Sequence, residues 1–531
     1  MPHAARRPVP AHPLRRLAAW VLATAALAGP LAAGGAAAPP EVRGTWLTTT
    51  ANTHIATPAE TARTMARLRE IGLNTVYVES WKNGYTQFPS EALERVIGVE
   101  RRPELMKSDP SDPEPTPPRD LLRETVIEAH RNQLACIAWF EYGFMAAHES
   151  TQNHLRKMYP HWLSRDAEGG EVAPNGFVWM NPLHPRTRRL VMDIVLEAVD
   201  KYDLDGVQLD DRIVWPYYTM GYDDFTVDWY RNEHGGQAPP EDPNDPEWRR
   251  WRVEKVNEFS RQFVAELRAK RPGLIVSLSP APYPWCYENY LLEWPEWASW
   301  RPGNDESPDA GAGRREGPGV WWDEFIPQCY RYDYPAFKAT WEQQIGNLRG
   351  AGPVARRRVD DMLAGVLTTG SRPDPVPWPD LEKAIGLVRE TGGGGHVWWF
   401  SRGVLDEYPE QIASLYDVEG SGHARRPDLP RDWRPAPVVL ERSPSEPDIW
   451  RADGAVPIEH YRVIVKRGGN WAVEDLLSAD DVRSMRRAVV VGVPGRIAER
   501  PGAGEAQAVE LLVDRRPDLS EWPPRIRGGA R

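Results

Sequence analysis

Cysteine is scarce in this chain of 531 residues, and no CxxC pair occurs. Cys136, Cys286 and Cys329 allow at most one internal disulfide and match no cysteine pattern of zinc or redox sites. The chain also lacks an HExxH motif and a glycine-rich phosphate loop with its Lys and Ser or Thr. We therefore expect no metal, no cofactor and no disulfide framework.

Positive charge is not in excess. The chain has 65 Lys and Arg against 76 Asp and Glu, which gives a net charge of −11, and the basic residues are dispersed among acidic ones. A face that binds nucleic acid or an anionic membrane needs clustered basic side chains. Nucleic acid is therefore not expected as a partner.

A long hydrophobic run is also missing. The apolar stretch from Leu17 to Ala33 is short and rich in alanine, whereas a membrane span needs roughly 20 apolar residues. Basic residues precede the stretch, and small residues follow it as far as Ala38. This order is typical of an export signal. We expect a signal peptide over residues 1–38, a periplasmic or extracellular mature protein, and no stable membrane insertion after cleavage. An uncleaved anchor is the alternative.

Amphipathic aromatic residues are abundant, with 24 Trp and 18 Tyr against 10 Phe. Such rings can stack on a sugar face while they hydrogen bond at their edges, although many of them must belong to the core.

Strand patterns alternate with helical patterns from residue 41 to residue 403. The predicted strands are 43–48, 74–79, 134–140, one that ends at Asp210, 274–279, 325–330, 361–368 and 395–400. Helical patterns separate them, at 57–72, 119–131, 190–199, 247–270, 336–349 and 381–390. Eight strands that alternate with helices predict the α/β class and a (β/α)8 TIM barrel. Strand and helix patterns no longer alternate over residues 404–531. This segment predicts a small β-rich accessory module, with strands at 461–466 and 488–493 and a disordered tail.

The fourth predicted strand ends in two carboxylates. Side chains alternate along a strand, so Gln208 and Asp210 share one face while Val207 and Leu209 share the other. The apolar face should contact the covering helices, which leaves Asp210 inside the barrel mouth. Asp211 reaches the mouth only if the strand has ended or bulged, and it can instead serve as a cap or as a partner of Arg212.

Carboxylates follow three adjacent strands: Glu79, Glu141, and Asp210 with Asp211. Glycosidic bond cleavage needs one protonated carboxyl as acid and one carboxylate as nucleophile or base. Neighbouring negative charge raises the pKa of one member and keeps it protonated. We predict Asp210 as nucleophile or base and Glu141 as acid. The two roles can be exchanged, and Asp211 can substitute for either residue.

Further strand-end and loop residues are predicted to contact a sugar. They are Arg43, Trp46, Glu79, Trp81, Asn83, Tyr142, Asn181, Gln328, Tyr330, Trp398 and Trp399. For Arg43, a buried ion pair with Glu79 is an equal alternative.

Several segments together carry a family resemblance. They are Arg43 to Trp46, Asn74 to Tyr77, Trp139 to Met145, Trp179 to Pro182, Asp205 to Asp211 and Pro327 to Tyr330. In this order they resemble the glycosyl hydrolase-like family 10 of bacterial proteins, most strongly over residues 41–350. The resemblance implies a TIM-barrel glycosidase-like fold, export to the cell envelope, and cleavage of glycan strands such as those of peptidoglycan. Many relatives have an aromatic residue or His where this chain has Arg212.

Two functions of different class follow. The first is an exported glycoside hydrolase that acts on a polysaccharide, and the second is a noncatalytic carbohydrate-binding barrel. An enzyme needs two inward carboxyls roughly 5–10 Å apart. Whether Glu141 and Asp210 point toward each other therefore decides between a hydrolase and a binding barrel. The sequence does not give the sugar, the linkage, the stereochemistry, the oligomeric state or the role of the C-terminal module.

Overall fold

A computed structural model describes residues 38–106, 119–300 and 321–427, and further along the chain the backbone of five strands. The predicted signal peptide lies outside these residues except for Ala38. The predicted strand at 488–493 and the predicted disordered tail also lie outside them.

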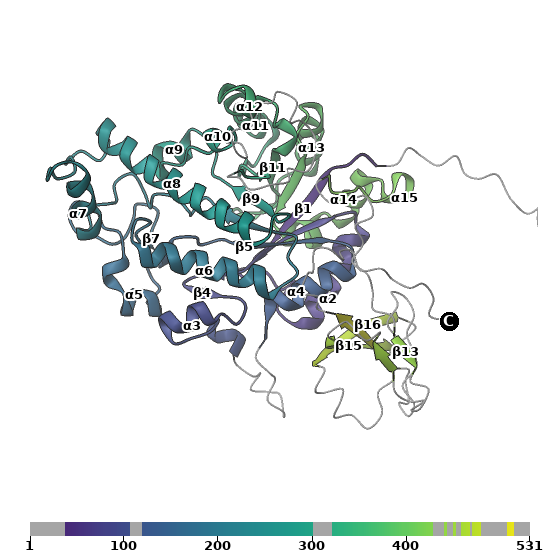
Figure 1. Ribbon diagram of the computed structural model, residues 1–531. Coiled ribbons are helices and arrows are strands. Elements are labelled where there is room, and N and C mark those ends of the chain that lie inside the picture. The colour runs from purple at the N-terminus through teal and green to yellow at the C-terminus, as the bar shows by residue number, and fades with distance from the viewer. Residues whose placement is uncertain are drawn as a thin grey trace, which may run out of the picture.

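Eight parallel strands form the central sheet (Figure 1). They are β1 (Val42–Leu47), β2 (Thr75–Glu79), β5 (Ala135–Phe140), β8 (Gly206–Asp210), β9 (Ile275–Ser279), β10 (Glu324–Phe325), β11 (Leu363–Leu367) and β12 (Gly395–Trp399). The sheet order runs β10-β9-β8-β5-β2-β1-β12-β11, and isolated parallel bridges from Phe325 to Met362 and from Gln328 to Gly365 join its two edges. The predicted (β/α)8 barrel is confirmed.

Except for α13 (Trp378–Glu390), the main helices between these strands begin after residues whose side chains cap them. Helix α2 (Pro58–Glu70) starts with Pro58 after Thr57, whose hydroxyl accepts from the Glu60 amide at 3.1 Å. The others are α4 (Leu121–Arg131), α6 (Pro185–Lys201), α8 (Pro246–Lys270), α11 (Tyr334–Gly350) and α13. Figure 1 shows α6 and α8 lying across the strands, where α6 buries its apolar residues.

The loops after the strands carry additional elements. They are the hairpin β3 (Trp81–Lys82) and β4 (Tyr85–Thr86), α3 (Glu91–Ile97), the hairpin β6 (Met145–His148) and β7 (Phe177–Trp179), α5 (His154–Met158), α7 (Asp224–Glu233), α9 (Trp285–Tyr290) and α10 (Trp294–Trp297). In Figure 1, α5, α7 and β7 gather at the left end, and α14 (Pro409–Tyr416) and α15 (Val418–Ser421) lie at the other. The carboxyl ends of the strands therefore form the elaborated face of the barrel.

The barrel interior is distinct from the layer between strands and helices. Val207 and Leu209 belong to the large outer core, as predicted from alternation along β8. Gln208 points inward, where it accepts a hydrogen bond from the Trp46 indole at 2.7 Å and donates to Ser277 at 2.9 Å. The predicted faces of this strand are confirmed.

The later strands pair among themselves. Strand β15 (Ile458–Arg467), which contains the predicted strand 461–466, pairs antiparallel with β16 (Asn470–Ser478) and β17 (Gln507–Val513). Strand β13 (Leu440–Arg442) pairs with β14 (Trp450–Ala452).

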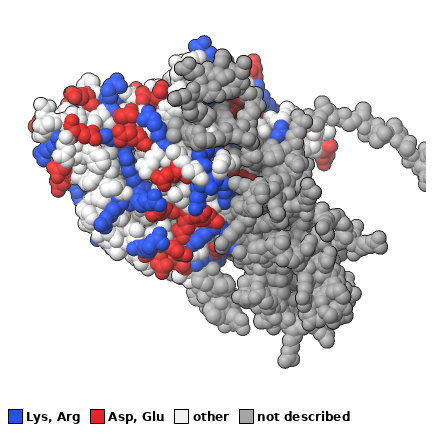
Figure 2. Space-filling model, in the orientation of Figure 1, with Lys and Arg blue, Asp and Glu red and all other residues white. Residues whose placement is uncertain are grey.

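In the described part of the chain, none of the helices combines the length and apolar character required to cross a bilayer. Figure 2 shows acidic and basic side chains intermixed on the visible face of the barrel, in agreement with their dispersal in the sequence.

Candidate active site

Asp210 is the last residue of β8, and its carboxylate points inward, as predicted. One oxygen, Oδ1, accepts from Gln328 Nε2 at 2.6 Å and from the Asp211 amide at 2.7 Å. The other, Oδ2, accepts from Trp139 Nε1 at 3.1 Å and from Arg212 Nη1 at 2.9 Å. These four donors fix the carboxylate in one orientation.

Glu141 reaches the same guanidinium from the end of β5. Its Oε1 lies 3.6 Å from Arg212 Nη1, the atom that is 2.9 Å from Asp210 Oδ2. Because both oxygens contact one nitrogen, they are no more than about 6.5 Å apart. The two carboxylates therefore face each other within the distance range of a glycosidase pair.

Lys82 extends this arrangement toward β2. Its ammonium lies 2.9 Å from Glu141 Oε2 and 2.8 Å from Glu79 Oε2. Glu79 also accepts from Thr48 Oγ1 at 2.7 Å and from the amide and hydroxyl of Thr49. Negative and positive groups thus alternate from Glu79 through Lys82, Glu141 and Arg212 to Asp210.

Burial controls the protonation of this cluster. It raises the pKa of Asp210 to about 7, although the charge of Arg212 opposes the shift. Burial raises the pKa of Glu141 to about 7 as well, against the charge of Lys82. For Glu79, burial is outweighed by Lys82 and by the Thr49 and Thr48 hydrogen bonds, so its pKa is lowered. Glu79 is accordingly a fixed anion, while Glu141 and Asp210 exchange protons near neutral pH.

Asp211 follows the end of β8 and lies on the other side of Arg212, whose Nε is 3.6 Å from Asp211 Oδ1. Among the residues that the structure describes, no donor hydrogen bonds to this buried oxygen. After burial, the Asp211 charge is the next largest influence that raises the pKa of Tyr290. The strand has ended at Asp210, which is the condition under which Asp211 was expected to reach the mouth.

Aromatic rings surround the inner side of Asp210. Trp46 is 5.8 Å from Trp399 and 6.3 Å from both Trp139 and Tyr330, measured between ring centroids. Tyr330 and Trp399 are partly exposed, whereas Trp46 is fully buried. Tyr330 and Trp399 therefore remain candidates for sugar contact. Trp46 instead packs against these two rings inside the barrel.

Two predicted residues lie away from the site and require correction. Arg43 projects outward from the start of β1, where it pairs with Glu41 at 2.9 Å and its guanidinium lies 4.3 Å from the Tyr416 ring centroid. The alternative pairing of Arg43 with Glu79 is also not formed. Trp398 points outward from β12 and donates to Tyr416 Oη at 2.8 Å. Both side chains belong to the packing between the barrel and α14.

Three other predicted residues support loops near the site. Trp81 is buried and donates to the Gly143 carbonyl at 3.0 Å. Asn83 has a positive φ of 51°, and its carbonyl accepts from the Asn153 amide at 2.7 Å. Asn181 is buried and donates to Asp223 and Thr226, which fixes the start of α7. Tyr142 is closer to the cluster, with the Lys82 ammonium 5.9 Å from its ring centroid.

The loop after β5 and the loop after β8 meet at Gly143. Its φ is 46°, and a Cβ there would lie 2.3 Å from the Arg212 carbonyl oxygen. The Phe144 amide donates to the same oxygen at 2.8 Å. Glycine is therefore required for the contact that holds Glu141 and Arg212 beside each other.

Sequence reasoning did not include Lys82, Trp139 or Arg212 among the site residues. Each carried a signal, however. Lys82 comes three residues after Glu79, Trp139 has the inward parity of its strand, and Arg212 comes two residues after Asp210.

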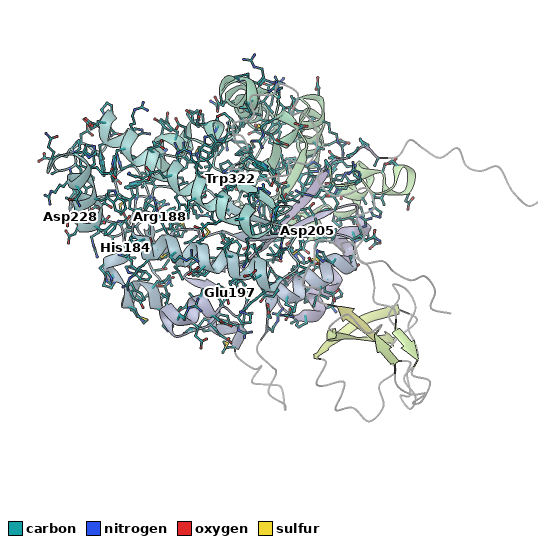
Figure 3. All side chains as sticks on the ribbon, in the orientation of Figure 1. His184, Arg188, Glu197, Asp205, Asp228 and Trp322 are labelled. Carbon is teal, nitrogen blue, oxygen red and sulfur yellow. The ribbon has the colours of Figure 1, made fainter. Side chains whose placement is uncertain are left out.

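Not every aspartate near β8 belongs to the site. Asp205 precedes the strand, and its Oδ2 accepts from the Cys136 amide at 2.8 Å and lies 2.9 Å from His130 Nε2. In Figure 3, Asp205 lies toward the opposite end of the barrel from His184 and Asp228. Within residues 38–106, 119–300 and 321–427, no group of three or more His, Cys, Asp or Glu is arranged to hold a metal ion.

Comparison with known families agrees with this geometry. Residues 41–302 match the family model Glycosyl hydrolase-like 10. These residues are similar to that family. The match confirms the resemblance seen in the sequence motifs, and the barrel is therefore glycoside hydrolase-like.

Individual relatives are distant. The chain is 23% identical over 265 residues to Glycosyl hydrolase DigH of Escherichia coli (strain K12), which covers 45% of this chain and 55% of that protein. It thus spans about half the length of the curated relatives it matches. The solved glycoside hydrolase domain of PgaB (BpsB) from Bordetella bronchiseptica is similar at a TM-score of 0.49 and 14% identity, covering 72% of this chain and 98% of that one. A β-galactosidase from Rahnella sp. R3 is similar at a TM-score of 0.47 and 12% identity, covering 72% and 56%.

Proposed function

We propose that this protein is an exported glycoside hydrolase that cleaves a polysaccharide with the Glu141 and Asp210 pair. The observation that carries the proposal is that both carboxylates contact the same Arg212 nitrogen from adjacent strand ends. Carboxylates that only accepted hydrogen bonds from a bound sugar would not need to face each other. Export is proposed from the basic and apolar pattern of residues 1–38.

The roles follow from the donors around each group. Asp210 receives four hydrogen bonds, a set that favours its ionised form. It would attack the anomeric carbon or take a proton from the attacking water. Burial raises the pKa of both carboxyls to about 7, so we assign the proton to Glu141, which receives fewer hydrogen bonds, and Glu141 would give that proton to the departing glycosidic oxygen. An oxygen separation of no more than about 6.5 Å favours direct attack by Asp210, since an intervening water needs roughly 6.5–9.5 Å.

Glycan strands of peptidoglycan are the first substrate to test, because the family resemblance implies envelope glycans. The experiment measures reducing ends released from peptide-free glycan strands and from a panel of other polysaccharides. It compares the wild type with Asp210→Asn, Glu141→Gln and Asp211→Asn. Asp228→Asn is the matched control, since Asp228 is an exposed aspartate on α7.

We expect the wild type and Asp228→Asn to release reducing ends at equal rates. Asp210→Asn and Glu141→Gln should each lose at least 100-fold in kcat, within the contribution of roughly 10²–10⁴ typical of acid–base groups. If only Asp211→Asn is inactive, Asp211 takes one of the two roles. Binding of glycan by all variants without any turnover would instead support a noncatalytic carbohydrate-binding barrel.

A further inference from the structure

Trp285 is the only aromatic side chain that is exposed among the residues with described burial, with 46% of its surface accessible. Large aromatic rings are normally buried because each contributes much apolar area to the core. The other tryptophans of the described barrel are buried or partly buried. Trp285 therefore stands out on the surface of a chain that buries its indoles efficiently.

The exposed indole lies at the same end of the barrel as the carboxylate cluster. Trp285 begins α9, in the loop that follows β9 at the carboxyl end of the barrel. Its ring centroid is 5.2 Å from that of Tyr290, with the planes nearly perpendicular at 88°. Asp211 influences the pKa of both Tyr290 and Cys286, which lie four residues apart on one face of α9. One side of α9 thus faces Asp211, and Trp285 extends from the same helix into solvent.

Tyr290, which contacts Trp285 and whose pKa Asp211 influences, is held in place by neighbouring loops. Its hydroxyl accepts from Asn175 at 3.1 Å, and its ring is 5.8 Å from the partly exposed Tyr217. Asn175, Tyr217 and Tyr290 come from the loops after β5, β8 and β9, so three barrel loops meet at this point. Trp285 consequently packs against a tyrosine that side chains from two neighbouring loops contact.

We propose that Trp285 is a stacking platform for a sugar ring of the bound glycan, beyond the sugars that contact the carboxylates. The inference rests on the proposed function and specifies its substrate as a chain of sugars. The apolar face of a pyranose covers an indole well, and the ring hydroxyls stay in water at the edges. Trp285 contacts Tyr290 and not the carboxylate cluster itself, so in this proposal the stacked sugar is a different residue of the glycan from those at the cleaved bond.

The test compares a polymer with a substrate too short to reach Trp285. Peptide-free peptidoglycan glycan strands serve as the polymer, and 4-nitrophenyl glycosides serve as the short substrates. The proteins are the wild type, Trp285→Ala, Trp285→Tyr and the control Trp300→Ala. Trp300 is a partly exposed indole that contacts Arg261 of α8 and Trp297.

We expect Trp285→Ala to lower kcat/KM on the polymer about tenfold through KM, a change equivalent to about 1.4 kcal/mol. Trp285→Tyr should recover part of this loss, and Trp300→Ala should resemble the wild type. Activity on the short substrate should be unchanged in Trp285→Ala, which shows that its catalytic groups are intact. Equal losses on both substrates, or no loss on either, would overturn the inference.

Affinity electrophoresis in gels that contain the glycan strands measures binding without turnover. It therefore tests the Trp285 platform independently of the proposed hydrolase activity. If the wild type has no turnover but is retarded, and Trp285→Ala is not, the platform exists in a noncatalytic barrel. If retardation of Trp285→Ala equals that of the wild type, Trp285 does not bind sugar. A change of oligomeric state in Trp285→Ala would assign the indole to self-association and would also overturn the inference.

Discussion

Lys82 is the residue through which the roles of the two carboxylates can be distinguished. It contacts Glu141 and Glu79 but not Asp210, whereas Arg212 contacts Glu141, Asp210 and Asp211. Its positive charge opposes the upward shift that burial gives to the pKa of Glu141. Removing that charge therefore changes the pKa of Glu141 more than the pKa of Asp210.

We predict that Lys82→Met raises the pKa of Glu141 above about 7, by roughly one unit or more. If Glu141 is the acid, activity requires its protonated form and falls as pH rises through its pKa. The alkaline limb of the pH–rate profile then moves to higher pH. If Glu141 is the base or nucleophile, activity requires the ionised form, and the acidic limb moves to higher pH instead.

Lys82→Arg is the matched variant, because it keeps the charge and should keep the wild-type profile. The measurement is kcat/KM on one glycan between pH 4 and 10 for folded protein. If the pH–rate profile of Lys82→Met is not shifted, the ionisation of Glu141 determines neither the acidic nor the alkaline limb of the profile.

The sequence correctly predicted that the carboxylates lie inside the barrel, but it also placed some outward-pointing residues there. The alternation of side chains along a strand explains both results. Asp210, Glu79 and Trp399 have the inward parity of their strands and lie inside the barrel. Arg43 is three residues from the inward Trp46, and Trp398 precedes the inward Trp399, so alternation places both outside. The role of Asn181 in holding α7 was not predictable, because Asp223 is distant in sequence.

The contact between two loops at Gly143 positions Arg212. The loop after β5 approaches the loop after β8 so closely that the Phe144 amide donates to the Arg212 carbonyl. This approach depends on the missing side chain at Gly143 and on its φ of 46°. The turn is therefore a structural requirement for the arrangement of Glu141, Arg212 and Asp210.

We predict that Gly143→Ala destabilises the protein by at least about 1–3 kcal/mol, since the new methyl group would clash with backbone at a strained φ. It should also lower kcat, because Arg212 must shift away from Asp210 and Glu141. Urea unfolding monitored by tryptophan fluorescence gives the stability, and reducing-end release gives the activity.

Gly169→Ala is the control, with a φ of 84° and no atom within 4 Å of the added Cβ. It shares the backbone strain but not the clash, so the difference between the two variants measures the loop contact. Equal stability and equal activity of the two variants would show that the loops tolerate separation.

At the level of elements, strand and helix patterns predicted the barrel because each unit is long and periodic. The sixth strand is the exception. It was predicted at 325–330, but regular pairing is confined to β10 (Glu324–Phe325). Pro327 has no amide hydrogen, and only an isolated bridge at Gln328 continues toward β11. The hairpins β3–β4 and β6–β7 were missed because strands of two to four residues show no periodicity.

The whole barrel is closed at the end opposite the carboxylates by residues that come after it in sequence. Ser421 and Arg425 carbonyls accept from the amides of Ala38 and Glu41, beside the start of β1. Arg426 enters the barrel interior, where its Nη2 lies 2.5 Å from Glu324 Oε2. The Tyr77 hydroxyl donates to the other oxygen of Glu324 at 2.8 Å. Residues 404–427 therefore contribute to the barrel. The boundary was predicted at residue 403 because strand and helix patterns stop alternating there.

We predict that Arg426→Met destabilises the barrel by about 3–5 kcal/mol, because the buried Glu324 would lose the ion pair with this guanidinium. The double variant Arg426→Met with Glu324→Gln should recover part of that stability, since it removes the buried charge of Glu324 as well. A chain that ends at residue 403 should behave like Arg426→Met or worse, and one that ends at 427 should retain this ion pair. Thermal unfolding of the wild type and of these four variants is the measurement. Because Arg426 and Asp210 lie at opposite ends of the barrel, kcat of the folded Arg426→Met variant should equal that of the wild type. An undiminished melting temperature in Arg426→Met would show that the two edges of the sheet hold the barrel closed without this residue.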